Sequence, residues 1–310
     1  MHVRPIDADG DFDEALALVQ ASDRSVYGDT DWTPAELRDQ WEDIELATDG
    51  WVVELDGRLA GLVHVCEVRN GRIITDGYVH PELAGRGVGT ALLDTVEARA
   101  RELEPSIAPG QRVYVETAHL VGDGAAARLL AGRGYERVRT FFRMVASLDH
   151  EPPRPEWPDG IVPGTIDLDR DLPELHAAFE TAFLEEWGHT PRSLEDWSEW
   201  AFGRRGCDPS LSVIARDGGE IAGFALNHPK QMGDWGWIGN VGVLPASRRR
   251  GIGLALLYES FHRIRATGER IAALGVDARN PTGATRLYER AGMRVLWRAD
   301  VWQKELRAGG

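Results

Sequence analysis

The sequence predicts two tandem domains of mixed α/β architecture, each a mixed β-sheet with helices on both faces. Its 310 residues are about twice the length of a typical single domain. Four stretches of the first half recur in the same order in the second half. Within each half, helix-like and strand-like segments alternate in an order that gives a mixed sheet covered by helices.

The internal repeat is the strongest of these observations, because unrelated stretches rarely match in order at constant spacing. By subtraction, the separations between matched residues are 160, 162, 164 and 158. The matched pairs are Ile6 with Ile166, Gly61 with Gly223, Gly87 with Gly251, and Tyr135 with Met293. We therefore expect both halves to share one fold.

A proline-rich stretch separates the halves. Five prolines between Ser147 and Gly164 disfavour a continuous helix or a central strand. We expect an N-terminal domain over residues 1–150, a linker over 151–164 and a C-terminal domain over 165–310.

The elements of the second half can be read in order from hydrophobic periodicity and turn residues. Helices are expected at 171–183 and 193–202, and then at 253–268 and 282–292. Strands are expected at 211–218, 220–228, 236–244, 271–278 and 294–306. The first half follows the same coarse order.

Composition is that of a soluble globular protein. The formal net charge of −15 opposes binding to nucleic acid phosphates. No apolar run approaches the length of a membrane span, and the first residues do not resemble a secretory signal. We expect a cytoplasmic protein with no membrane or nucleic acid partner, acting as a monomer or homodimer. The two cysteines, Cys66 and Cys207, lack the spacing of a disulfide framework or a metal site.

A glycine-containing turn occurs once in each half, as "RRRGIGLALL" from Arg248 and "AGRGVGTALL" from Ala84. Each follows an expected strand and precedes an expected helix. The first N–H groups of such a helix have no intrahelical partner and carry partial positive charge, so the turn predicts an anion site, best filled by phosphate. A dinucleotide-binding turn and a Walker loop fit less well, because the turn lies in mid-domain and GxxxxGK[ST] is absent. A turn with solvated arginines is the plain structural alternative.

A second motif about 25 residues later narrows the interpretation. "RRRGIG" is followed by "NPTGATRLYERAG", with Asn280, Gly283, Leu287, Tyr288 and Gly292 in the pattern Nxx[AG]xxxLYxxxG. Together these stretches resemble the pyrophosphate loop and the following helix of the GNAT superfamily of acyl-CoA-dependent N-acyltransferases. The resemblance covers both halves and implies two tandem GNAT domains.

The resemblance implies acetyl-CoA as cofactor and assigns residues to it. Strand "NVGV" would pair with pantetheine through backbone groups, and Tyr288 would protonate the departing thiolate. The implied coenzyme A residues of the second half are Val241, Gly242, Val243, Arg248, Arg249, Arg250, Gly251, Ile252, Gly253, Leu254, Asn280 and Tyr288. Asn280 could also cap the helix, and Tyr288 could also belong to the core.

The general base stays open at the level of sequence. Related enzymes carry a carboxylate on the strand before the turn, and the matching residue here is Trp237. Asp234 lies just upstream, and Glu185, Glu186 and His189 lie in the stretch "FLEEWGHTP". We take Glu185 and Glu186 as catalytic candidates beside Tyr288. No metal site is expected.

Five tryptophans gather near the expected acceptor side of the second half: Trp187, Trp197, Trp200, Trp235 and Trp237. Aromatic walls suit an organic cation or a flat amine, but indoles are also common in cores.

The first half is expected to be degenerate. In an ungapped overlay of the repeats, Leu130 takes the place of Tyr288 and Gly122 that of Asn280, so the acid is missing. Its turn begins with Ala84 in the place of Arg248, yet its anion-binding backbone is expected to persist. The implied coenzyme A residues of this half are Val79, Arg86, Gly87, Val88, Gly89 and Thr90.

The sequence as a whole predicts an N-acetyltransferase that moves acetyl from acetyl-CoA to a primary amine of a small molecule by direct attack. Neither cysteine has a recognisable histidine partner in the sequence, which disfavours an acyl-enzyme. Two alternatives remain: a pair of acyl-CoA-binding pseudoenzymes, and a protein N-terminal or lysine acetyltransferase.

Overall fold

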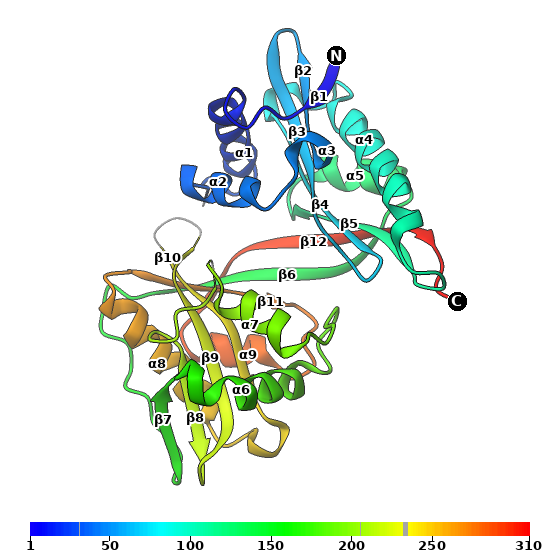
Figure 1. The fold of residues 1–310 in the computed structure, drawn as a ribbon. Helices are drawn as coiled ribbons and strands as arrows, with labels where there is room; N and C mark the ends of the chain where they lie inside the picture. Colours follow the sequence, from blue (N-terminus) through cyan, green and yellow to red (C-terminus); the bar gives the residue numbers. More distant parts are fainter. Residues whose placement is uncertain (31, 205, 232–234) are drawn as a thin grey trace. The chain divides into compact units, whose positions relative to one another are not determined.

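The computed structural model describes residues 1–30, 32–204, 206–231 and 235–310 (Figure 1). It divides into two compact units: unit 1 comprises Met1–Phe141 and Trp297–Gly310, and unit 2 comprises Phe142–Leu296. Both contain a mixed sheet with helices on its two faces, so the predicted fold class is confirmed.

Unit 1 contains most of the first half of the sequence. Its strands are hydrogen-bonded in the order β1, β2, β3, β4, β5, β12, β6. Its elements are β1 (His2–Pro5), α1 (Phe12–Tyr27), α2 (Pro34–Glu42), α3 (Leu46–Asp49), β2 (Gly50–Leu55), β3 (Arg58–Arg69), β4 (Arg72–Val79), η1 (Pro81–Leu83), α4 (Val88–Leu103), η2 (Glu104–Ser106), β5 (Val113–Leu120), α5 (Gly124–Gly132) and the first part of β6 (Glu136–Ser147).

Unit 2 repeats this plan, with its strands in the order β6, β11, β10, β9, β8, β7. Its elements after β6 are β7 (Ile161–Thr165), α6 (Leu168–Phe183), α7 (Leu194–Phe202), β8 (Val213–Asp217), β9 (Glu220–Gln231), β10 (Trp235–Val243), η3 (Pro245–Ser247), α8 (Ile252–Ala266), β11 (Ile271–Asp277), α9 (Ala284–Arg290) and the start of β12 (Arg294–Arg307). The four predicted helices and five predicted strands of this half are all present.

The division into units differs from the domain boundaries expected from sequence. Strand β12 pairs antiparallel with β5 from Ala299↔Leu120 to Arg307↔Val113, so the C-terminal residues complete the sheet of unit 1. The last part of β6, from Phe142, belongs to unit 2. Residues 161–164, expected in the linker, form part of β7. Pro163 is tolerated there because β7 is the last strand in the order of unit 2.

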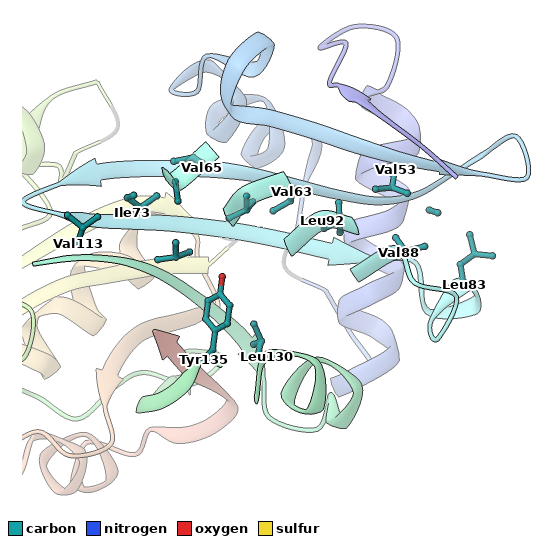
Figure 2. Packing of buried hydrophobic residues seen from close by; sticks show 14 residues of the cluster. Val53, Val63, Val65, Ile73, Leu83, Val88, Leu92, Val113, Leu130 and Tyr135 are labelled. Atoms are coloured by element: carbon teal, nitrogen blue, oxygen red, sulfur yellow. The ribbon is translucent and has the colours of Figure 1, made fainter. Parts of the chain in front are cut away.

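Each sheet buries a different cluster on each face. In unit 1, α4 and α5 cover a cluster that includes Val63, Ile73 and Leu92, whereas α1 and α2 cover Leu18, Leu37 and Leu62. Figure 2 shows the first cluster, with Leu130 beside Tyr135. The tryptophan-containing cluster of unit 2 lies between α6, α7 and the sheet, and α8 and α9 cover the opposite side.

Candidate functional site

The glycine-containing turn of unit 2 joins β10 to α8. The chain passes through Arg249 (φ 63°) and Gly251 (φ 99°), both in the left-handed region. Helix α8 begins at Ile252, and Gly251 offers no side chain to cap its first N–H groups. These donors and the positive end of the helix dipole favour an anion at this turn.

The left-handed conformation of Arg249 is unusual for a residue with a side chain. Such a backbone costs roughly 1–3 kcal/mol and is concentrated at functional sites. The first half has Gly85 (φ 78°) at the matching position, 164 residues earlier by subtraction. The turn geometry is thus kept in both halves, even where the residue is not glycine.

The two glycines of the second turn have different structural roles. A Cβ on Gly251 would meet no atom closer than 4.0 Å, so the space beside it is open. A Cβ on Gly253 would lie 2.9 Å from Leu287 Cδ2. Gly253 therefore permits close packing of α8 against α9. Of these two glycines, only Gly251 leaves open space for a ligand.

The three arginines of the turn are not equivalent. Arg248 donates from Nε to the carbonyl of Val243 (3.1 Å) and from Nη2 to that of Ala182 (3.4 Å). Arg250 forms an ion pair with Asp217. Arg248 therefore ties the turn to the end of β10 and to α6. Arg249 and Arg250 are both exposed, and Arg249 has the left-handed backbone.

Strands β10 and β11 separate beside the turn. Their parallel pairing covers Gly236↔Ala272 and Trp237↔Ala273, and a register shift follows in β10 between Ile238 and Asn240. In unit 1, β4 and β5 pair in parallel from Arg72↔Tyr114 to Thr75↔Thr117. In both units the parallel register of the described strands ends before the strand reaches the turn.

The backbone of β10 presents polar groups on the side away from β9. Leu244 donates to Ala222 of β9 (3.0 Å), and alternate residues of a strand direct their N–H and C=O groups to opposite sides. Gly242 therefore faces β9 like Leu244, whereas Val241 and Val243 face away from it. His80 donates to Ala60 in the same way (2.9 Å), so Val79 has the matching orientation in unit 1.

Tyr288 and Glu186 interact electrostatically in unit 2. Tyr288 lies on α9 and is buried; burial and the nearby Glu186 carboxylate raise the pKa of its hydroxyl. Burial also raises the pKa of Glu186, Asp277 raises it further, and His189 opposes the shift. Unit 2 therefore combines a carboxyl that gives up its proton less readily than usual with a hydroxyl that keeps its proton, and the charge of the first acts on the second. This combination suits a general base and a general acid.

The remaining candidates for the general base differ from Glu186 in exposure or in hydrogen bonding. Glu185 is exposed next to the half-buried Glu186. His189 Nε2 lies 2.9 Å from Glu180 Oε2, and Glu180 also accepts from the backbone N–H of Arg192 (3.4 Å). His189 thus helps hold the loop against α6. Asp234 lies outside the described residues.

The tryptophans do not form one wall. Trp197 is fully buried in the core cluster beside Phe179, which agrees with the core alternative for this residue. Trp200 is exposed, with the Arg192 guanidinium 5.2 Å from its ring centroid. Trp237 lies under the guanidinium of Arg143 at 4.4 Å. Trp187 and Trp235 are half-buried.

Two smaller expectations need correction. Asn280 does not cap α9: its Oδ1 accepts from Thr282 N (2.9 Å) and Thr282 Oγ1 (2.6 Å), and Gly283 is the N-cap. Cys207 does have a histidine neighbour, because its Sγ lies 3.3 Å from His228 Nε2. Burial raises the pKa of the Cys207 thiol to about 12, so the thiolate needed for an acyl-enzyme is disfavoured.

The turn of unit 1 has the same framework. Gly87 (φ 87°) begins α4, a Cβ on Gly89 would lie 2.8 Å from Leu129, and Arg86 pairs with Asp56 (2.8 Å). Val88 is buried and Thr90 exposed. Leu130, which matches Tyr288, is buried in the core.

Sequence reasoning missed Asp277, which ends β11 and is buried. Its Oδ1 accepts from the N–H of Arg279 (2.8 Å), and its charge raises the pKa of Glu186. An acidic residue at the carboxyl end of a parallel strand is the signal that could have identified it.

Comparison with known proteins gives consistent matches. A family model described as "Acetyltransferase (GNAT) family" matches residues 16–119 and 172–293. The mycothiol acetyltransferase of Thermobispora bispora is 34% identical over 234 residues, covering 72% of each chain. That of Thermomonospora curvata is 32% identical, covering 76% of each.

Solved structures resemble the chain over its full length. A GCN5-related N-acetyltransferase from Sphaerobacter thermophilus has a TM-score of 0.90 and 34% identity, covering all of this chain and 96% of that one. A tandem GNAT protein from the clavulanic acid biosynthesis pathway has a TM-score of 0.74 and 18% identity, covering 100% and 99%. With two matched segments and relatives of this similarity, the chain belongs to the GNAT family of acetyltransferases and is an N-acetyltransferase with tandem domains.

Proposed function

We propose that unit 2 transfers an acetyl group from acetyl-CoA to the primary amine of a small molecule by direct attack. The observation that carries this proposal is the electrostatic pairing of Glu186 with Tyr288. The relatives named mycothiol acetyltransferase support a small-molecule acceptor. We place this reaction in the cytoplasm, in a monomer or homodimer.

Coenzyme A would lie over the turn and along the edge of β10 that faces away from β9, where β10 and β11 separate. The outward N–H and C=O groups of Val241 and the outward N–H of Val243 suit the amides of pantetheine, whereas the Val243 carbonyl accepts from Arg248. The open space at Gly251 and the first N–H groups of α8, from Ile252 to Leu254, suit the pyrophosphate, with Arg249 adding positive charge. Acetyl-CoA supplies the acyl group as a thioester.

The side chains divide the proton transfers between them. Glu186 accepts the proton of the attacking amine, directly or through one water, because its raised pKa makes it a stronger base than an ordinary carboxylate. Tyr288 donates its hydroxyl proton to the departing sulfur. Asp277 acts through Glu186, so it is a positioning residue.

Replacing Gly251 with valine is expected to abolish coenzyme A binding at unit 2. The branched side chain would occupy the open space beside the helix start, and the left-handed backbone disfavours it. Calorimetric titration with coenzyme A measures the loss. Gly87→Val places the same side chain at the matching cap of unit 1, and binding at unit 2 should survive it. Unaltered affinity in a folded Gly251→Val protein contradicts the assignment of the turn.

Initial-rate kinetics are expected to give intersecting lines when acetyl-CoA and amine are varied together. Direct attack needs both substrates bound at once, and the pKa of about 12 disfavours acylation of Cys207. Release of coenzyme A thiol, followed with a panel of small amines, provides the measurement. Parallel lines together with an isolable acylated cysteine would overturn this pathway. If only peptides act as acceptors, the enzyme modifies proteins instead.

A further inference from the structure

Unit 1 contains a partly buried polar cluster that its expected coenzyme A site does not use. The cluster consists of His64 on β3, Asp76 and Tyr78 on β4, and Gln40 on α2. His64 and Asp76 are direct partners in the antiparallel register of β3 and β4. Gln40 Nε2 and the Tyr78 hydroxyl both donate to Asp76 Oδ2, at 3.5 and 3.0 Å.

The cluster lies on the face of the sheet that α1 and α2 cover. Leu62, two residues before His64, packs in the core beneath these helices, and side chains two apart on a strand share a face. Tyr78 packs against the same core. The parallel register of β4 with β5 ends at Thr75, so Asp76 is the next residue of β4 after it. Asp76 itself is half-buried, which leaves it reachable from outside.

Hydrogen bonding within the cluster is incomplete. His64 is fully buried, and within the described residues neither of its ring nitrogens has a hydrogen-bond partner. The same holds for the buried Oε1 of Gln40. Leaving such a buried polar group unpaired costs on the order of 1–3 kcal/mol, and native structures seldom keep one without a reason.

The charge balance of the cluster is negative. Burial lowers the pKa of His64, which favours the neutral ring. Burial and the nearby Asp76 and Asp23 raise the pKa of Tyr78, which keeps its proton. Among the described residues, the donors to Asp76 are both neutral groups, so no cation hydrogen-bonds to its carboxylate.

We propose that this cluster is a second small-molecule site, specific to unit 1, that takes a protonated primary amine. Among the described residues, Asp76 Oδ1, Gln40 Oε1 and one ring nitrogen of His64 receive no hydrogen bond, and an ammonium group has three N–H bonds to give. The carboxylate supplies the opposite charge. A metal ion fits less well: the described residues include no group of three or more His, Cys, Asp or Glu side chains that could hold one.

The matching positions of unit 2 carry different chemistry. With the separations of the repeat, His64 corresponds to Leu226, Asp76 to Asn240 and Tyr78 to Gly242. The polar side chains of the cluster are therefore not repeated in unit 2. The cluster is specific to the first half, and binding to it does not depend on catalysis in unit 2.

The test is histidine-detected NMR on the full chain. The His64 resonance, identified by its loss in His64→Gln, is followed during titration with ethanolamine, benzylamine or glucosamine, and with the N-acetyl derivative of each. A primary amine should shift this resonance saturably, and its N-acetyl derivative should not. Asp76→Asn should weaken the binding about tenfold or more, because a charge-assisted bond is lost.

Two further variants serve as controls. Glu67→Gln neutralises an exposed carboxylate on the same strand and should leave the His64 response unchanged. Glu186→Gln alters unit 2 and should also leave it unchanged, so failure here is distinguishable from failure of the proposed reaction. No response to any of the three amines, an equal response to the N-acetyl compounds, or full binding by Asp76→Asn would overturn the proposal. If Asp76→Asn does not fold, the comparison of each amine with its N-acetyl derivative in the wild-type protein decides.

Discussion

Tyr288→Phe is expected to lower turnover by about a hundredfold or more while leaving coenzyme A affinity nearly unchanged. The substitution removes one hydroxyl and keeps the ring that packs in the core of unit 2. Burial and Glu186 raise the pKa of that hydroxyl, so in the wild type it retains a proton to donate near neutral pH. Thiol release gives turnover, and calorimetry gives affinity.

Tyr258→Phe is the matched control for this substitution. Tyr258 lies on α8, packs against the same core, and its hydroxyl makes only a long 3.5 Å bond to the carbonyl of Arg290. Turnover should stay within a few-fold of wild type. If Tyr258→Phe loses as much activity as Tyr288→Phe, the loss reflects packing and the acid has been misassigned.

The contrast between Tyr288 and Leu130 explains why we expect one catalytic half. Both residues are buried at the same place in the repeat, so the fold needs an apolar body there but not a hydroxyl. Leu130 meets that need in unit 1 without supplying an acid. A duplicated domain can therefore lose the catalytic group and keep its core.

The turn and its following helix could be predicted from sequence because their requirements are local. A left-handed cap favours glycine, and the helix start that follows is an anion site wherever it occurs. The role of Gly253 is different, because only the approach of Leu287 from another helix reveals it. The sequence motif identifies both glycines, but it does not show that Gly251 leaves space for a ligand and that Gly253 allows close helix packing.

Other features depend on contacts between distant residues. The sequence predicts a strand over 294–306. Hydrophobic periodicity does not show which strand it pairs with, and in the structure it pairs with β5. Trp197 and Trp200 lie three residues apart on α7, yet one is fully buried and the other exposed. Glu185 and Glu186 are neighbouring residues of the same type. Only the burial of Glu186 and its nearby Asp277 distinguish them.

Glu186→Gln is expected to lower kcat/KM by about a hundredfold or more, because the amide cannot accept the proton of the amine. Glu185→Gln is the matched comparison, since the neighbouring carboxylate is exposed. We expect it to leave kcat/KM within a few-fold. A large loss in Glu185→Gln with little change in Glu186→Gln would show that the wrong carboxylate has been chosen.

The pH dependence separates a base from a residue that merely shapes the site. Glu186 acts only when deprotonated, so kcat/KM should rise with pH through a pKa that lies above the ordinary range of a glutamate. The raised pKa of Tyr288 keeps the acid protonated over this rise. In Glu186→Gln the residual activity should lose the rising limb.

Stability should respond to the same group with the opposite sign. The raised pKa means that the native state holds a proton on Glu186 at pH values where the unfolded chain has released it. The free energy of unfolding therefore falls as pH rises from the unfolded pKa through the folded one. Glu186→Gln should remove this fall and be no less stable than wild type at neutral pH, as measured by thermal unfolding. Loss of activity with stability retained assigns the effect to proton transfer, whereas an equal rising limb in wild type and variant excludes Glu186 as the base.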